Sequence, residues 1–209
     1  MVGSDAPTRR TICISHATGA GGAAVGQTVA EWLGFRYVDD EVISEAAEWA
    51  ELDPALVADA ERRKPFIARL LGQLGEQGST RLPTGDATRS LPSDADLRKL
   101  IAAALGSFAS QGSVVIVAHA ASFALSGGNV LRVLVTASPE TRAARIAADR
   151  GIGERDAARL LKDEDAGRAD YLRRFYGVER ELPTHYDVVL NTDALTPADA
   201  AAIVVAAAG

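Results

Sequence analysis

Apolar residues along the chain fall into two kinds of pattern. Short, almost continuously apolar runs rich in β-branched residues occur at positions 11–15, 113–117 and 130–136, with a weaker run at 186–190. Runs of this kind are typical of strands covered on both faces, and therefore of a parallel sheet. Residues 35–38 are expected to add a short strand or an extended segment.

The segments between these runs carry the spacing of amphipathic helices. A first helix is predicted to open at the glycine-rich turn and to continue through 27–33. Further helices are predicted at 40–50, 54–73, 93–110, 139–150, 154–175 and 197–208. Thr196 is a suitable N-cap for the last helix, with Pro197 at its first position. Residues 75–92 are rich in Gly, Ser, Thr and Pro, which indicates a surface loop. Strands alternating with helices predict a doubly wound α/β fold.

Composition narrows the class of protein. A chain of 209 residues fits one globular domain. Its net charge of -6 argues against general nucleic-acid binding, which depends on attraction to phosphates. The single cysteine, Cys13, lies in the first predicted strand, so we expect a buried thiol and no intrachain disulfide. Residues 1–10 lack the apolar segment of a signal peptide, and no run of about 18 apolar residues occurs, so we expect a cytoplasmic protein without a membrane partner.

The most informative segment is SHATGAGGAAVG at residues 15–26, which follows the first predicted strand and opens a helix. Glycines let backbone N–H groups approach an anion, and the helix start adds unsatisfied N–H groups and a positive dipole end. The segment therefore predicts a phosphate-binding turn. Where a P-loop carries Lys and Ser/Thr, this chain has Gly22 and Ala23.

Two nucleotide-binding folds use such a turn. Its glycines, with Asp39 or Asp40 about 20 residues later, also match the dinucleotide-binding pattern of NAD(P)-dependent oxidoreductases. No constellation suited to hydride transfer follows, however. The eight arginines between positions 142 and 174 instead favour phosphoryl transfer, because guanidinium groups bind phosphate oxygens with paired N–H bonds. Some of these arginines are expected to pair simply with nearby acids on solvated helix faces.

Several segments together resemble the cytidylate kinase-like family of P-loop nucleoside monophosphate kinases. The resemblance rests on the glycine-rich turn, LGFRYVDDEVI, SVVIVAHAASF, the stretch from RVLVTASPETR to YLRRFYG, and YDVVLNTDALTPADAAAIV. Their order and spacing cover most of the chain outside roughly residues 56–95. The resemblance implies one P-loop kinase-like domain over residues 1–209, with three layers and a parallel central sheet. It also implies a helical acceptor-binding insertion at approximately 40–95 and an Arg-rich lid at approximately 145–175.

The resemblance also assigns roles to residues. Asp39 and His119 would contact the acceptor, although Asp39 and its acidic neighbours also suit a helix cap. Four lid residues would serve catalysis, with Asp165 orienting an arginine one turn later. These four are Arg145, Arg150, Asp165 and Arg168. The donor nucleotide, ATP with Mg²⁺, would lie against Ser15, His16, Gly19, Ala20, Gly21, Gly22 and Ala23, with Ser15 placed to offer an oxygen to the metal.

The chain also departs from the family's pattern. Members typically carry a Ser-Arg pair after the first strand and a Gly-Arg pair after the strand at 113–117, where this chain has Ser15-His16 and Ala118-His119. Histidine, with an ordinary pKa near 6.5, replaces two fixed cations by conditional ones. Either the acceptor carries less charge, or bound phosphate raises the histidine pKa values, or catalysis has been lost.

The leading hypothesis is a kinase that transfers the γ-phosphoryl group of ATP to a nucleoside monophosphate resembling CMP. The alternatives are a catalytically silent nucleotide sensor of the same fold and, less favoured, an NAD(P)-dependent oxidoreductase. Trp32, Trp49 and His185 are interpreted as structural residues, the tryptophans as part of the core. Alanine-rich helices such as that at 200–208 can pack within a subunit or between copies in a homo-oligomer.

Overall fold

The core of the protein is a five-stranded parallel sheet flanked by helices. The computed structural model describes residues 9–39, 41–49, 94–118, 121–125, 127 and 129–209. The strands are β1 (Thr11–His16), β2 (Arg36–Val38), β3 (Val114–Val117), β4 (Val130–Thr136) and β5 (Val188–Asn191). Their order in the sheet is β2-β3-β1-β4-β5, and all four pairings are parallel. The parallel α/β fold predicted from the sequence is confirmed.

The central position of β1 follows from its composition. Every side chain from Thr11 to Ser15 is buried, because helices cover both faces of this strand. Ile12 pairs with Val115 on β3 and with Leu131 on β4. The strand therefore delivers the glycine loop (residues 17–21) to the middle of the carboxyl edge of the sheet, where ligands of open α/β sheets bind.

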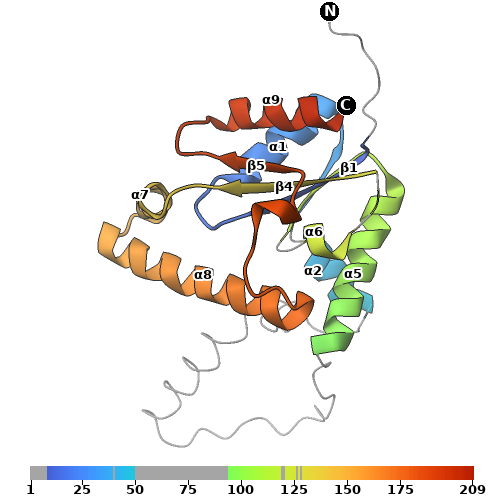
Figure 1. Ribbon diagram of the computed structural model, residues 1–209, viewed down its shortest axis with the longest axis horizontal. Helices are drawn as coiled ribbons and strands as arrows, with labels where there is room; N and C mark the ends of the chain where they lie inside the picture. Colours follow the sequence, from blue (N-terminus) through green and yellow to red (C-terminus); the bar gives the residue numbers. More distant parts are fainter. Residues whose placement is uncertain (1–8, 40, 50–93, 119–120, 126, 128) are drawn as a thin grey trace, which may run out of the picture.

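One face of the sheet is covered by α1 (Gly22–Leu33) and α9 (Pro197–Ala208), which lie together above the strands in Figure 1. Val25 and Val29 of α1 and Val204 of α9 join the apolar core on this side. The Thr196 side chain caps α9 by accepting from the Asp199 N–H, while the Asp199 carboxylate accepts from the Thr196 N–H. This reciprocal cap confirms the helix start predicted from the sequence.

The other face is covered by α2 (Glu41–Trp49), α5 (Asp94–Gln111), the short α6 (Ala121–Ala124) and the end of α8 (Glu154–Tyr176). Before α8 comes α7 (Pro139–Arg150), which starts at the carboxyl end of β4 and packs on α8 through a small third cluster of apolar residues. A single 3₁₀ turn, Pro183–His185, precedes β5. Figure 1 shows α7 beside the glycine loop, at the edge where β4 and β5 end.

Four expectations from the sequence differ from the described structure or lie outside it. The tryptophans were expected in the core, yet the side chains of Trp32 and Trp49 are 54% and 47% exposed. Trp32 is the second-last residue of α1, so its side chain is largely exposed at the helix end although its spacing from Val25 and Val29 fits their apolar stripe. The helix predicted at 54–73 and the loop predicted at 75–92 lie outside the described residues, as does most of the acceptor-binding insertion expected at approximately 40–95.

The strand order separates the two nucleotide-binding folds considered above. In the dinucleotide-binding fold the strand after the first helix lies next to the first strand. Here β3 lies between β1 and β2, so the strand that leads to Asp39 is not the neighbour of β1. This topology contradicts the NAD(P)-dependent alternative.

Candidate functional site

The glycine loop makes a tight turn that side chains would obstruct. Gly19 and Gly21 have φ angles of +77° and +79°, in the left-handed region that favours glycine. Gly22, the first residue of α1, packs against the end of β1, and a Cβ there would lie 2.3 Å from the His16 Cβ. Close contact between helix and strand thus explains Gly22, and backbone conformation explains the other two glycines.

Side chains from distant segments hold the carbonyl oxygens of this region. Arg168 Nη1 donates to the His16 oxygen at 3.0 Å, and Arg142 Nε donates to the Thr18 oxygen at 2.6 Å. Thr192 Oγ1 donates to the Ala20 oxygen at 2.8 Å. Arg145 Nη1 lies 3.4 Å from the Gly19 oxygen. Four carbonyls in five residues are therefore bound by side chains from α7, α8 and the end of β5.

This arrangement orients the opposite side of the loop. In a trans peptide the C=O and the following N–H point in opposite directions, so fixing the Thr18 and Ala20 carbonyls directs the Gly19 and Gly21 N–H groups the other way. Within the described ranges, these two N–H groups have no protein acceptor. The first turn of α1 adds further unsatisfied N–H groups and the positive end of the helix dipole. The loop can therefore accept an anion with the geometry of a phosphate.

Asp165 has a different partner from the one expected. It was expected to orient Arg168, yet its carboxylate accepts from Arg142 Nη1 and Nη2 at 3.1 and 2.6 Å. Arg142 is almost fully buried, and its fork geometry matches the carboxylate. The sequence expectation failed because the proximity of Asp165 and Arg168 on one helix did not reveal that α7 packs on α8.

Arg168 is instead oriented by Glu181. Its Nε and Nη2 donate to the two Glu181 oxygens at 3.0 and 2.6 Å, and the Tyr186 hydroxyl donates to the same carboxylate. Burial alone raises the pKa of Glu181, but the hydrogen bonds and charge of Arg168 outweigh it and hold this pKa below its ordinary value. Burial and the neighbouring Glu181 carboxylate raise the pKa of Tyr186. The Glu181 carboxylate therefore holds the Arg168 guanidinium so that its Nη1 reaches the His16 carbonyl at the end of β1.

Arg145 and Arg150, both expected to approach phosphates, lie in different surroundings. Arg145 donates to the Thr192 oxygen at 2.6 Å and to Thr192 Oγ1 at 3.0 Å, which places it beside the glycine loop. Arg150 is exposed in the last turn of α7, near the left-handed Gly151 that ends the helix. Arg145, Asp165 and Arg168 thus gather near the loop, whereas no contact in the described part of the chain brings Arg150 to it.

The surroundings of His16 disfavour its protonated form. Burial lowers its pKa below the ordinary value, and the hydrogen bond with the Ala17 carbonyl opposes this only in part; the charges of Arg168 and Arg142 lower the pKa and that of Asp39 raises it. Its Nδ1 lies 3.3 Å from the Ala17 oxygen. The structure therefore does not support a cationic His16 before phosphate binds. His119 lies outside the described residues.

Two oxygen-bearing side chains were expected near the ligands. The Tyr37 hydroxyl donates to Asp39 Oδ2 at 3.0 Å, and the charge of Asp39 acts on His16, so this carboxylate lies near the end of β1. Ser15 is fully buried, with its Oγ 3.5 Å from Ser122 Oγ. The expected role of Ser15 as a metal ligand stays a prediction.

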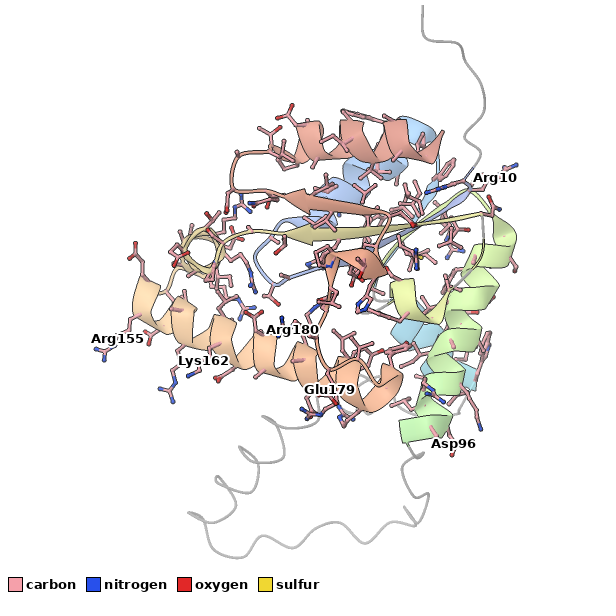
Figure 2. All side chains as sticks on the ribbon, in the orientation of Figure 1. Arg10, Asp96, Arg155, Lys162, Glu179 and Arg180 are labelled. Atoms are coloured by element: carbon pink, nitrogen blue, oxygen red, sulfur yellow. The ribbon has the colours of Figure 1, made fainter. Side chains whose placement is uncertain are left out.

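The donor set around the loop suits an anion better than a protein-only metal centre. Among the described residues, no group of three or more His, Cys, Asp or Glu side chains is arranged to hold a metal ion. Mg²⁺, however, usually needs only one or two carboxylates, with phosphates and water as its other ligands, and Asp39 offers one carboxylate. The cationic side chains of Arg155 and Lys162 do not belong to this donor set, because they point from α8 into solvent (Figure 2).

Sequence reasoning missed four residues of this site. Arg142 was one arginine among eight, and Glu181, Tyr186 and Thr192 carried no motif. Thr192 directly follows β5, and a polar side chain after a parallel strand is the one signal that pointed to the carboxyl edge of the sheet. Arg142 reaches the turn only through tertiary packing, and Glu181, with Tyr186 bonded to it, reaches the end of β1 through Arg168.

Comparisons with known proteins agree with the family resemblance of the sequence. The model of the cytidylate kinase-like family matches residues 11–194. A cytidylate kinase of Methanocorpusculum labreanum is 25% identical over 197 residues, which cover 94% of each chain. An uncharacterized protein from Eubacterium ventriosum shares the fold with a TM-score of 0.67 and 16% identity, over 96% of this chain and 98% of that one. A gluconokinase from Sinorhizobium meliloti shares it with a TM-score of 0.51 and 16% identity, over 97% and 93%. Every helix within the described ranges is too short or too polar to cross a membrane.

Proposed function

Because the chain belongs to the cytidylate kinase-like family, we propose that it transfers the γ-phosphoryl group of ATP to a nucleoside monophosphate of the CMP type. The observation that carries the proposal is the orientation of the glycine loop. Its Thr18 and Ala20 carbonyls are bound by Arg142 and Thr192, and its N–H groups at Gly19 and Gly21 remain available to phosphate oxygens.

This geometry offers a substitute for the missing P-loop lysine. The lysine normally brings positive charge to the outer phosphates. Here the guanidinium groups of Arg142, Arg145 and Arg168 surround the loop, and only two of them have carboxylate partners in the described part of the chain. The site thus supplies positive charge through neighbouring helices instead of through the loop itself. Phosphoryl transfer needs mainly positioning and charge neutralisation, both of which these groups provide.

Two further parts of the reaction follow from the residues present. Asp39 would hold Mg²⁺ together with the phosphates, and the bound ion would neutralise charge across the transferred group. His16, whose pKa is lowered by burial, lies where relatives typically carry arginine, so one fixed cation is missing from the edge of the sheet. An acceptor monophosphate would therefore depend more on Arg168, whose guanidinium lies beside the His16 carbonyl.

The decisive experiment measures ADP formation from ATP and Mg²⁺ with CMP, dCMP, UMP, AMP, GMP and the matching nucleosides. Chromatography of the products separates acceptor phosphorylation from ATP hydrolysis, and calorimetry measures ATP binding in parallel. A diphosphate product from one monophosphate supports the proposal and names the acceptor. ATP binding without turnover on any acceptor contradicts it and favours the nucleotide sensor.

A further inference from the structure

Arg142 is a residue of α7 that contacts the glycine loop with both its backbone and its side chain. A Cβ on Gly19 would lie 2.8 Å from the Arg142 carbonyl oxygen and 3.2 Å from its Cα, so the backbone of α7 packs directly on the loop. The side chain of Arg142 is only 7% exposed. Its Nε binds the Thr18 oxygen at 2.6 Å. Backbone contact and side-chain contact therefore coincide at one residue.

The same guanidinium is held from the other side by α8. Asp165 accepts two hydrogen bonds from Arg142. Together with the bond to the Thr18 oxygen, three of the five guanidinium N–H groups are bonded within the protein. The Asp165 side chain is 44% exposed, so it lies at the open margin of the contact between the helices. Arg142 thus connects the loop, α7 and α8 through one rigid, planar group.

We infer that Arg142 is a positioning residue for the nucleotide-binding loop and that Asp165 keeps its guanidinium in register with the Thr18 carbonyl. The reasoning starts from the Thr18–Gly19 peptide. Its oxygen is fixed by Arg142, and the direction of the Gly19 N–H follows from peptide planarity. Any movement of α8 that displaces Asp165 shifts the guanidinium and turns this N–H. The lid helix and the loop are therefore coupled, and the inference rests on the proposed use of that loop for ATP.

This role differs from that of an arginine that binds phosphate. A phosphate ligand needs its N–H groups directed at the nucleotide, whereas Arg142 directs three of them at Thr18 and Asp165. A lysine at 142 would retain the charge but lacks the planar fork that reaches a carbonyl and a carboxylate together. The two roles therefore predict opposite behaviour for Arg142→Lys.

The test uses Asp165→Asn, with Asp163→Asn as the matched control. Asp163 is an exposed residue two positions earlier on α8, and the structure records no contact for its carboxylate within the described ranges. Hydrogen–deuterium exchange of peptides covering residues 16–24 reports loop order without requiring turnover. We expect Asp165→Asn to increase exchange there several-fold while the β3 and β4 peptides keep their protection, and Asp163→Asn to change neither.

Kinetics give the second readout. With the acceptor identified, Asp165→Asn and Arg142→Lys should each lower kcat/KM for ATP by about ten- to a hundredfold, because small misplacements of a positioned group have effects of this size. The KM for the acceptor should change less than about twofold, since the perturbed peptide belongs to the donor side. A merely structural role would lower the melting temperature without this difference between donor and acceptor.

The outcomes separate the inference from the proposed function. Unchanged loop exchange in Asp165→Asn, or an Arg142→Lys variant that keeps wild-type ATP kinetics, overturns the inference even if the kinase is active. An inactive wild-type protein overturns the proposed function. The exchange measurement then still decides whether Asp165 orders the loop. If Arg142→Lys fails to fold, Asp165→Asn with its Asp163→Asn control keeps the test intact.

Discussion

Gly21 and Gly34 provide a matched pair of substitutions at the two ends of α1. Both residues are left-handed, with φ of 79° and 66°, and a Cβ on either would meet no heavy atom within 4 Å. Alanine at each position should therefore experience the same backbone strain, roughly 1–2 kcal/mol, and no steric clash. In a domain of this size, such a loss lowers the melting temperature by about 2–8 °C.

The two variants should differ in nucleotide binding. Alanine at Gly21 can relieve its strain by rotating the Ala20–Gly21 peptide, which releases the Ala20 carbonyl from Thr192 and turns the Gly21 N–H away from the anion. A hydrogen bond to a charged group contributes about 1.5–3 kcal/mol, so ATP should bind about ten- to a hundredfold more weakly. Gly34→Ala lies at the far end of the helix and should bind ATP normally.

Calorimetric titration with ATP and thermal unfolding of both variants check this reasoning. The reasoning is refuted if Gly34→Ala weakens ATP binding as much as Gly21→Ala, because the effect would then come from lost stability. It is equally refuted if Gly21→Ala binds ATP like the wild type, since the orientation of that peptide would not matter.

Arg168→Lys should lower turnover by about ten- to a hundredfold with little change in fold, because lysine keeps the charge but loses the paired bonds to Glu181. Steady-state kinetics measure the turnover and circular dichroism checks the fold. Wild-type turnover in this variant would contradict a role for Arg168 in the site. His16 has a lowered pKa in the folded state, so the unfolded chain binds more protons below about pH 6.5, and stability should fall as pH decreases through this region. Urea unfolding at pH 7.5, 6.5 and 5.5 should show this loss, and a His16→Asn variant with the same pH dependence would contradict the assignment. Glu181, whose pKa is also lowered, contributes stability that is present above about pH 4.5 and lost at more acidic pH. In acid-induced unfolding, Glu181→Gln should lack this part of the pH dependence of stability. Burial raises the pKa of Cys13 to about 12, so its thiol should react with a disulfide reagent only on unfolding, and rapid reaction of the native protein would contradict the described burial.

The sheet could be predicted because its strands carry the signal themselves. The apolar run at 130–136 gave the bounds of β4 without error, and the run at 11–15 missed only His16 of β1. Helix starts were predicted where a capping residue marks them, as at Thr196. The position of β3 between β1 and β2 is not encoded in any local pattern, because strand order depends on which apolar faces the connecting helices cover.

The site was predictable only in part, for a related reason. Gly19 and Gly21 adopt the left-handed backbone conformation that glycine favours, so the glycine pattern in the sequence was enough to locate the loop. The partners of the arginines could not, because Arg142 and Asp165 are 23 residues apart and meet only when α7 packs on α8. Spacing along one helix suggested Arg168 as the partner of Asp165. In the folded protein Asp165 instead binds Arg142, and Arg168 binds Glu181.

The central place of β1 has a consequence for biosynthesis. Ile12 has no strand partner until Val115 and Leu131 have been made, and the Ala20 carbonyl waits for Thr192. A ribosome that adds about 5–20 residues per second needs roughly ten to forty seconds to pass from Ile12 to Thr192. The glycine loop is therefore synthesised early but reaches its final conformation only after Thr192 has been made. A nascent chain arrested before Thr192 should not be retained by immobilised ATP.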